Sequence, residues 1–236
     1  MRNSILPALA AMAVTAEAAK AYIPSVWNNT APAIHTQLVQ AKNGFFEVGG
    51  VADGICQDYN PGCPSANSTI ISGPVSSKYD GNKTTDFWLG ITDPKGQQIY
   101  VYDQKLMYTL PRTNVVSGPE GNAINGPFSV DYDDLAQGTV LRFQGNDWAA
   151  CKTFNVRQGV RTIVQPLVYG SSLWENAFGW ECTPFKMTLE ETDAPAVDHY
   201  RRDCPFQWLN TSPELCMGQT WGLVNADGSC VAPASG

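Results

Sequence analysis

The chain of 236 residues is 43% hydrophobic and 16% charged, with a formal net charge of −7. This length supports one sizeable core rather than two full domains. The negative charge argues against nucleic acid and anionic membranes as partners, because both attract clustered Lys and Arg. With 21 glycines, 16 prolines and few long amphipathic runs, the sequence predicts an all-β fold, a single antiparallel β-sandwich or barrel-like domain.

The N-terminal segment, residues 1–21, predicts a secretory signal peptide. Arg2 supplies a positive charge, and the apolar stretch at residues 5–14 is too short to span a bilayer. Small residues then offer two cleavage positions, after Ala18 and after Ala21, and the sequence leaves both open. No other run is long and apolar enough to cross a membrane, so we expect a secreted, extracellular protein without a membrane partner.

The strands expected after this segment alternate apolar and polar residues between turn signals. Asn43-Gly44 separates two such runs and is a strong hairpin signal, because both residues tolerate the positive φ of a type I′ turn. A second hairpin is expected over residues 96–109, where two alternating runs rich in tyrosine flank a polar turn. Further strands are expected at residues 69–71, 87–89, 128–132, 139–143, 162–169 and 185–189.

Two segments are predicted to lie outside the sheet. Residues 72–85 are polar and contain Gly, Pro and Ser, which is typical of an exposed insertion. From residue 194 the β alternation stops, so we place the domain at residues 22–193 and treat residues 194–236 as a short disulfide-bearing extension. His199 is expected on a polar linker there, beside Arg201-Arg202, which we interpret as an exposed basic pair rather than a processing site.

Seven cysteines in a secreted chain predict disulfides rather than metal or redox sites. We expect Cys56 to pair with Cys63 across a tight turn, and Cys151 to pair with Cys182 between two late strands. The other three lie in the extension: Cys204, Cys216 and Cys230. Because seven is odd, one cysteine is free or pairs with another chain. With only two histidines and no cysteine pair at zinc-knuckle spacing, neither a metal nor a cofactor is predicted.

Four asparagines stand in N-glycosylation acceptor motifs, each with Ser or Thr two positions further on. They are Asn28, Asn67, Asn82 and Asn210. Together with the signal segment, these motifs predict a glycoprotein that carries at least one glycan on a solvent-facing loop.

Motifs for catalysis are missing from the sequence. It contains no nucleophile elbow, phosphate-binding loop or zinc-protease motif, and two histidines leave little room for acid–base chemistry. A glycoside hydrolase that uses two carboxylates is retained as a third hypothesis, behind a non-enzymatic protein.

The acidic stretch Asp131, Asp133 and Asp134 is interpreted as a solvated turn rather than a calcium site. His35 is expected in a strand, as a structural side chain.

The seven tryptophans are expected mainly in the core, because aromatic side chains favour strands and bury large areas. Trp148 and Trp174 are the two candidates for stacking on sugar rings, since each lies among polar or small residues typical of loops. This pair supports a second hypothesis, a carbohydrate-binding or secreted effector module.

Short motifs in a matched order, from Pro32 to Cys182, resemble one family of proteins. The motifs are Pro32-Ala33-Ile34-His35, Ala41-Lys42-Asn43-Gly44-Phe45, Gly49-Gly50, Cys56, Cys63-Pro64, Asn67-Ser68-Thr69-Ile70, Gly96-Gln97-Gln98-Ile99-Tyr100-Val101, Leu106, Thr109, Pro119-Glu120-Gly121, Gly126-Pro127-Phe128, Ala150-Cys151 and Cys182. Their order resembles that of the small secreted cell-wall proteins of filamentous fungi typified by the phialide protein PhiA, which include IgE-binding allergens.

The resemblance implies a β-sandwich-like, glycosylated, non-enzymatic protein at the fungal cell wall, linked in some members to conidiation or host recognition. It implies no catalytic residues. The expected partner is a wall polysaccharide or a wall protein. Residues 72–85, Lys152 and the extension with its three cysteines depart from the family pattern. The extension is therefore a place where a binding role or a partner chain outside the family pattern is considered, including a disulfide to another chain through the odd cysteine.

Overall fold

Strands separated by short turns make up most of the part of the chain that the structure describes. The computed structural model describes residues 20–56, 68–79, 82–92, 96–102, 104–109, 123–155, 159–167, 182–194 and 196–201. These ranges contain no α-helix, and so none that is long and apolar enough to cross a membrane. The strands are β1 (Ala21–Trp27), β2 (Val39–Lys42), β3 (Phe45–Val48), β4 (Gly54–Ile55), β5 (Ile71–Tyr79), β6 (Asn82–Leu89), β7 (Ile99–Tyr102), β8 (Lys105–Tyr108), β9 (Ala123–Ile124), β10 (Phe128–Asp133), β11 (Gly138–Phe143), β12 (Trp148–Asn155), β13 (Gly159–Pro166), β14 (Cys182–Glu191) and β15 (His199–Tyr200).

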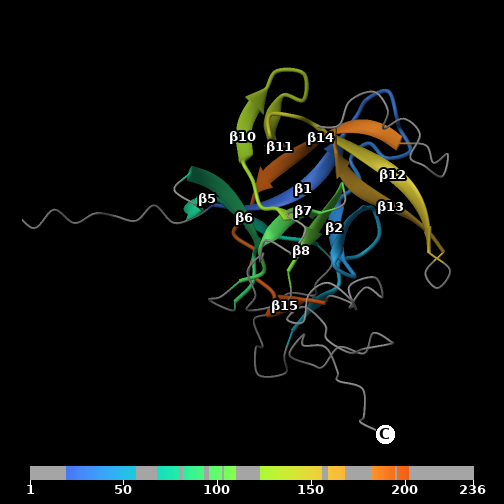
Figure 1. The fold of residues 1–236 in the computed structure, drawn as a ribbon. Coiled ribbons are helices and arrows are strands. Elements are labelled where there is room, and N and C mark those ends of the chain that lie inside the picture. Colours follow the sequence, from blue (N-terminus) through green and yellow to red (C-terminus); the bar gives the residue numbers. More distant parts are fainter. Residues whose placement is uncertain are drawn as a thin grey trace, which may run out of the picture.

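Thirteen of these strands form one antiparallel sheet (Figure 1), whose main path runs β6-β5-β1-β14-β12-β13-β3-β8-β7-β9. Three strands branch from it, since β11 pairs with both β14 and β10, and β2 pairs with β3. An isolated bridge between Trp88 and Gln98 brings β6 to the residue before β7. The first strand of the path therefore touches the segment before β7 at one point, without closing the sheet into a continuous barrel. The predicted all-β antiparallel class is confirmed.

Both hairpins expected from local turn signals are present. Asn43 and Gly44, between β2 and β3, have φ values of 51° and 86°, the left-handed conformation that a two-residue turn requires. β7 and β8 pair as the second hairpin. Tyr100 and Tyr108 of this hairpin are buried, so they are packing residues.

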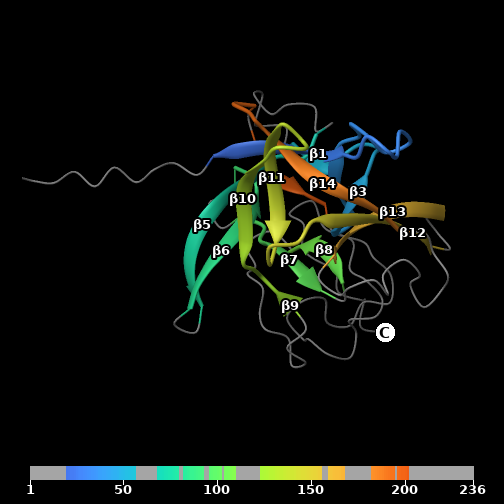
Figure 2. The ribbon, with the colours of Figure 1, turned by 90° about the horizontal axis from the view of Figure 1, so that it is seen from above.

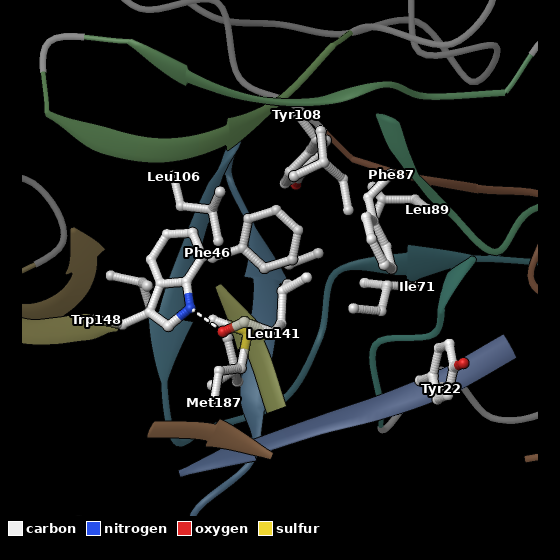
Figure 3. Packing of buried hydrophobic residues seen from close by; sticks show 14 of the residues in the cluster. Tyr22, Phe46, Ile71, Phe87, Leu89, Leu106, Tyr108, Leu141, Trp148 and Met187 are labelled. Atoms are coloured by element: carbon white, nitrogen blue, oxygen red, sulfur yellow. Dashed lines mark hydrogen bonds between the residues drawn. The ribbon is translucent and has the colours of Figure 1, made fainter. Parts of the chain in front are cut away.

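The core collects large apolar side chains from strands that are far apart in the sequence (Figure 3). Phe46 of β3, Leu106 of β8, Leu141 of β11, Trp148 of β12 and Met187 of β14 are each at most 1% exposed. Full burial of one such side chain stabilises the folded state by about 1.5–3 kcal/mol. The non-local core therefore holds the strands in their relative positions.

Residues 72–79 and 82–85 do not lie outside the sheet, contrary to the prediction from the sequence. They belong to a long hairpin of β5 and β6, which curves away from the rest of the sheet (Figure 2). Tyr79 pairs with Asn82, which leaves the two-residue sequence Asp80-Gly81 between the strands. Asp-Gly favours such hairpin turns. These strands were missed because they are polar and lack the alternating apolar residues by which a strand is recognised in a sequence, although the Asp-Gly turn signal between them is strong.

The first strand begins before the predicted end of the signal segment. The carbonyl of Lys20 accepts a hydrogen bond from the Gly73 amide at 3.1 Å, and the carbonyl of Ala21 accepts one from the Thr192 amide at 3.0 Å. Lys20 and Ala21, which fall within the predicted signal segment, are therefore part of the folded structure. Of the two cleavage positions, the one after Ala18 keeps both carbonyls, and we favour it.

Residues beyond the predicted domain end at residue 193 also pack against the sheet strands. β15 pairs with β4, at the lower end of the view in Figure 1, and Tyr200 is completely buried. The Tyr200 amide donates to Oε1 of Gln97 at 2.7 Å, and Nε2 of Gln97 donates to the Tyr200 carbonyl at 2.9 Å. A two-residue strand has no periodicity of its own to detect, so only these distant contacts define it. The domain extends to Arg201, the last residue that the structure describes.

Candidate functional site

Disulfides are the predicted site features that the structure tests most directly. Cys151 and Cys182 lie opposite each other in β12 and β14 and are joined, with an S–S distance of 2.05 Å, as predicted. The chain-entropy model assigns this 31-residue separation a stabilisation of about 3.7 kcal/mol. Cys56 is also disulfide-bonded. The other predicted disulfide cysteines lie outside the described residues: Cys63, Cys204, Cys216 and Cys230.

The prediction that Trp148 stacks on sugar rings is wrong. Its side chain is 0% exposed, and its indole N–H donates to the Leu141 carbonyl at 2.7 Å, the dashed line in Figure 3. Small and polar neighbours in the sequence suggested a loop, but β12 begins at Trp148 and directs this ring into the core. Trp174 lies outside the described residues.

Two of the predicted glycan acceptors are described. Asn28 lies just after β1, where its Oδ1 accepts hydrogen bonds from the amide and the hydroxyl of Thr30 at 2.9 and 2.8 Å. Its Nδ2 donates to the Pro184 carbonyl at 2.6 Å. Asn82 is the first residue of β6, at the end of the long hairpin. Asn67 and Asn210 lie outside the described residues.

Both histidines are placed differently from the prediction. His35 lies in the turn between β1 and β2 rather than in a strand, and its Nδ1 accepts the Asn28 amide at 3.2 Å. Its ring meets that of Trp27 edge-on, with 6.5 Å between the ring centroids. His199 is only 3% exposed in β15, so it is not on a polar linker.

Sequence reasoning missed one polar surface, which the sheet register assembles. Asp131 of β10 lies opposite Val140 of β11, and Val140 lies opposite Thr188 of β14. Thr188 in turn lies opposite Ser25 of β1, and paired residues share one face of a sheet. Residues two positions along each strand point to the same side. We call the resulting surface the charged face: Ser129, Asp131 and Asp133 of β10, Arg142 of β11, Lys186 and Thr188 of β14, and Ser25 and Trp27 of β1. Val140 lies on the same side of the sheet but is completely buried.

Ion pairs cross this face and join it to Asp147, in the turn before β12. Oδ2 of Asp133 accepts hydrogen bonds from Arg142 Nη2 at 2.6 Å and Lys186 Nζ at 2.7 Å. Asp147 accepts from Arg142 Nε at 3.2 Å on one oxygen and from Lys186 Nζ at 3.1 Å on the other. Asp131 accepts from Arg142 Nη1 at 3.4 Å. Two cations thus hold three carboxylates in fixed positions.

These contacts shift the pKa values of the network. Hydrogen bonding from Lys186, and then from the Ala136 amide, lowers the pKa of Asp133 to about 2. Burial opposes the charge on Lys186, but hydrogen bonds to Asp133 and Asp147 outweigh it and raise the pKa of the ammonium group. At neutral pH both groups therefore remain charged.

The acidic stretch at residues 131–134 is only partly exposed to solvent, whereas the sequence predicts a solvated turn. Asp131 and Asp134 are exposed, but Asp133 is 8% exposed, and its Oδ1 accepts the amides of Leu135 and Ala136 at 3.0 Å. Both oxygens of Asp133 are thus bound by protein donors. Within the described ranges, no group of three or more His, Cys, Asp or Glu residues is placed to hold a metal ion.

No protein-family model matches the chain, and neither does any curated protein or solved structure. What the charged face can do chemically is therefore inferred from its own contacts and charges. Its carboxylates accept hydrogen bonds from Arg142 and Lys186, an arrangement that suits hydrogen bonding to a ligand.

Acid is expected to weaken the fold through Asp133. Its pKa is about 2 in the folded state and about 3.9 in an unfolded chain, so its stabilising contribution is present above pH 3.9 and is lost as the pH falls towards 2. Urea unfolding of the wild type between pH 6 and pH 2 is expected to show a steeper loss of stability than the Asp133→Asn variant.

The exposed neighbour Asp134 provides the control for this measurement. The Asp134→Asn variant is expected to follow the wild-type pH profile. Parallel profiles for the wild type and Asp133→Asn would show that Asp133 does not titrate as this network requires.

Proposed function

We propose that this protein is a non-enzymatic glycoprotein that is secreted and retained in the fungal cell wall. The observation that carries the proposal is the disulfide bonding of Cys151, Cys182 and Cys56. Disulfides form and persist in oxidising environments such as the extracellular space and are rare in cytosolic proteins. The signal segment and the four acceptor asparagines are consistent with this route.

The charged face supports the non-enzymatic part of the proposal. A glycoside hydrolase needs one carboxyl group that carries a proton to the leaving group. Asp133 has a pKa of about 2, and each oxygen of Asp147 accepts a hydrogen bond from a cationic side chain. Neither group is suited to that step, so hydrolysis stays behind binding as a hypothesis.

The assignment to the cell wall comes from the ordered resemblance to PhiA-like proteins over residues 32–182. A secreted, host-facing effector is the alternative, because residues 202–236 lie outside both the resemblance and the described residues. The two differ in where the protein accumulates, in the wall or in the medium.

Fractionation of a filamentous fungus that expresses the full chain tests the proposal. We expect the protein in isolated, salt-washed walls, with further release by detergent or reductant, and a loss of apparent mass after enzymatic removal of N-glycans. A variant that lacks residues 2–18 serves as the control and is expected to stay inside the cell. Recovery of the wild type entirely from the medium, with none released from washed walls, would contradict wall retention.

A further inference from the structure

A row of four side chains crosses the charged face, one from each of four neighbouring strands. Trp27 of β1 pairs with Lys186 of β14, and Ser129 of β10 pairs with Arg142 of β11. Arg142 is one position beyond the Leu141–Met187 pair, so it is the next neighbour of Lys186. All four residues of the row are partly exposed. With about 4.8 Å between strands, the row spans about 14 Å, the length of a few sugar rings.

The row is preorganised for binding. Lys186 and Arg142 are each held by two or more carboxylates, so their positions are fixed before any ligand arrives. A side chain that is already ordered loses little entropy on binding. The edge-on contact between Trp27 and His35, at 81° between ring planes, covers at most one face of the indole. The row therefore places an aromatic ring beside fixed hydrogen-bonding groups.

The balance of charges on the charged face indicates which class of ligand it can bind. The two cations of the charged face are outnumbered by three carboxylates, and the whole chain carries a net charge of −7. Sites for phosphate, sulfate or carboxylate ligands need Arg or Lys that is not already neutralised. A neutral ligand rich in hydroxyl groups both donates to the carboxylates and accepts from the cations, and its apolar ring faces pack on an aromatic ring.

We propose that the charged face binds a neutral polysaccharide chain, with Trp27 stacked on one sugar ring and Lys186, Arg142 and Ser129 facing its hydroxyl groups. The proposal rests on the proposed function in one respect, because the cell wall supplies such a ligand. The aromatic residue proposed to stack on a sugar ring is thus Trp27, which is partly exposed on the opposite side of the sheet from the core. Trp148, the residue that the sequence suggested for this role, is buried.

Titration calorimetry on the full-length secreted protein tests this proposal, after enzymatic removal of N-glycans because Asn28 adjoins the row. The probes are a hexamer of β-1,3-linked glucose and a hexamer of β-1,4-linked N-acetylglucosamine, with polygalacturonate as the anionic comparison. We expect binding of at least one neutral hexamer and none of polygalacturonate. Trp27→Ala is expected to weaken the binding about tenfold or more, as truncation of a central aromatic contact does.

Two further variants keep the result interpretable. Tyr132 is 66% exposed on β10 but alternates to the other face from Asp131, so Tyr132→Ala is the matched control and is expected to bind like the wild type. Ser25→Arg leaves Trp27 in place and adds a long side chain beside the row, so it is expected to block binding even if Trp27→Ala fails to fold.

Three results would overturn the proposal: no binding of either neutral hexamer, unchanged affinity in both Trp27→Ala and Ser25→Arg, or a preference for polygalacturonate. Self-association of the wild type that Ser25→Arg abolishes would instead assign the face to a second copy of the chain.

A protein retained in the wall that binds neither hexamer would refute this site but not the proposed function. A protein that binds a hexamer but stays out of the wall would refute wall retention only.

Discussion

Replacing Tyr200 with Ala is expected to lower the free energy of unfolding by about 3–5 kcal/mol, the range for truncation of a buried aromatic side chain. The ring is 0% exposed and packs against Tyr108, with 6.5 Å between centroids. The Tyr200 hydroxyl accepts the Ile70 amide at 2.8 Å, and burial raises the pKa of this hydroxyl to about 12. Tyr200→Phe removes this acceptor and the hydroxyl's donation to the Ser68 carbonyl at 3.4 Å, and is expected to cost about 1–3 kcal/mol.

Urea unfolding of both variants provides the measurement, with the exposed Tyr132→Ala as the control, expected within about 0.5 kcal/mol of the wild type. The result also decides the domain boundary. If Tyr200→Ala is as stable as the control, β15 does not contribute to the core, and the domain ends near residue 193 as the sequence suggested.

Replacing Glu47 with Gln is the second change for which we expect a large effect, a loss of about 3–5 kcal/mol. Glu47 of β3 and Arg161 of β13 form an ion pair in which each side chain is 9% exposed, and Nε of Arg161 donates to Oε1 of Glu47 at 2.8 Å. The guanidinium also lies 5.1 Å from the centre of the Phe45 ring. Without its carboxylate partner, the buried charge of Arg161 is poorly compensated, which destabilises the fold.

An exposed ion pair in the same chain gives the matched control. Lys20 and Glu191 are 2.5 Å apart but 57% and 63% exposed, so Glu191→Gln is expected to cost no more than about 1 kcal/mol. Thermal and urea unfolding of both variants compare the two environments directly. Similar losses in Glu47→Gln and Glu191→Gln would show that burial does not strengthen the Glu47–Arg161 pair.

Predictions from sequence succeeded where a short stretch of chain contains its own signal. Asn43-Gly44 defines a hairpin because only a few residue types adopt positive φ at low cost. The Cys151–Cys182 pair followed from the expectation that cysteines of a secreted chain pair and from their positions between late strands. The hairpin of β5 and β6 was missed although the sequence contains Asp-Gly between its two strands, because the polar strands were interpreted as a loop.

Predictions that needed to know what surrounds a residue failed. Trp148 and His199 both lie among polar or small residues in the sequence, yet both are buried, because residues from distant strands cover them. The same limit applies to the charged face. Trp27 and Lys186 are 159 positions apart in the numbering, and nothing local to either residue indicates that they pair.

The sequence by itself determined that the chain is all-β and antiparallel, where its two clearest hairpins turn, and that Cys151 and Cys182 are partners for each other. These features depend on backbone preferences and alternation, which act over a few residues. Tertiary structure alone decided that Lys20 and Tyr200 pack into the fold, that Trp148 is buried, and which charged side chains share a face with Trp27. Burial and strand register depend on contacts between segments far apart in the chain, so they exist only once the sheet has formed.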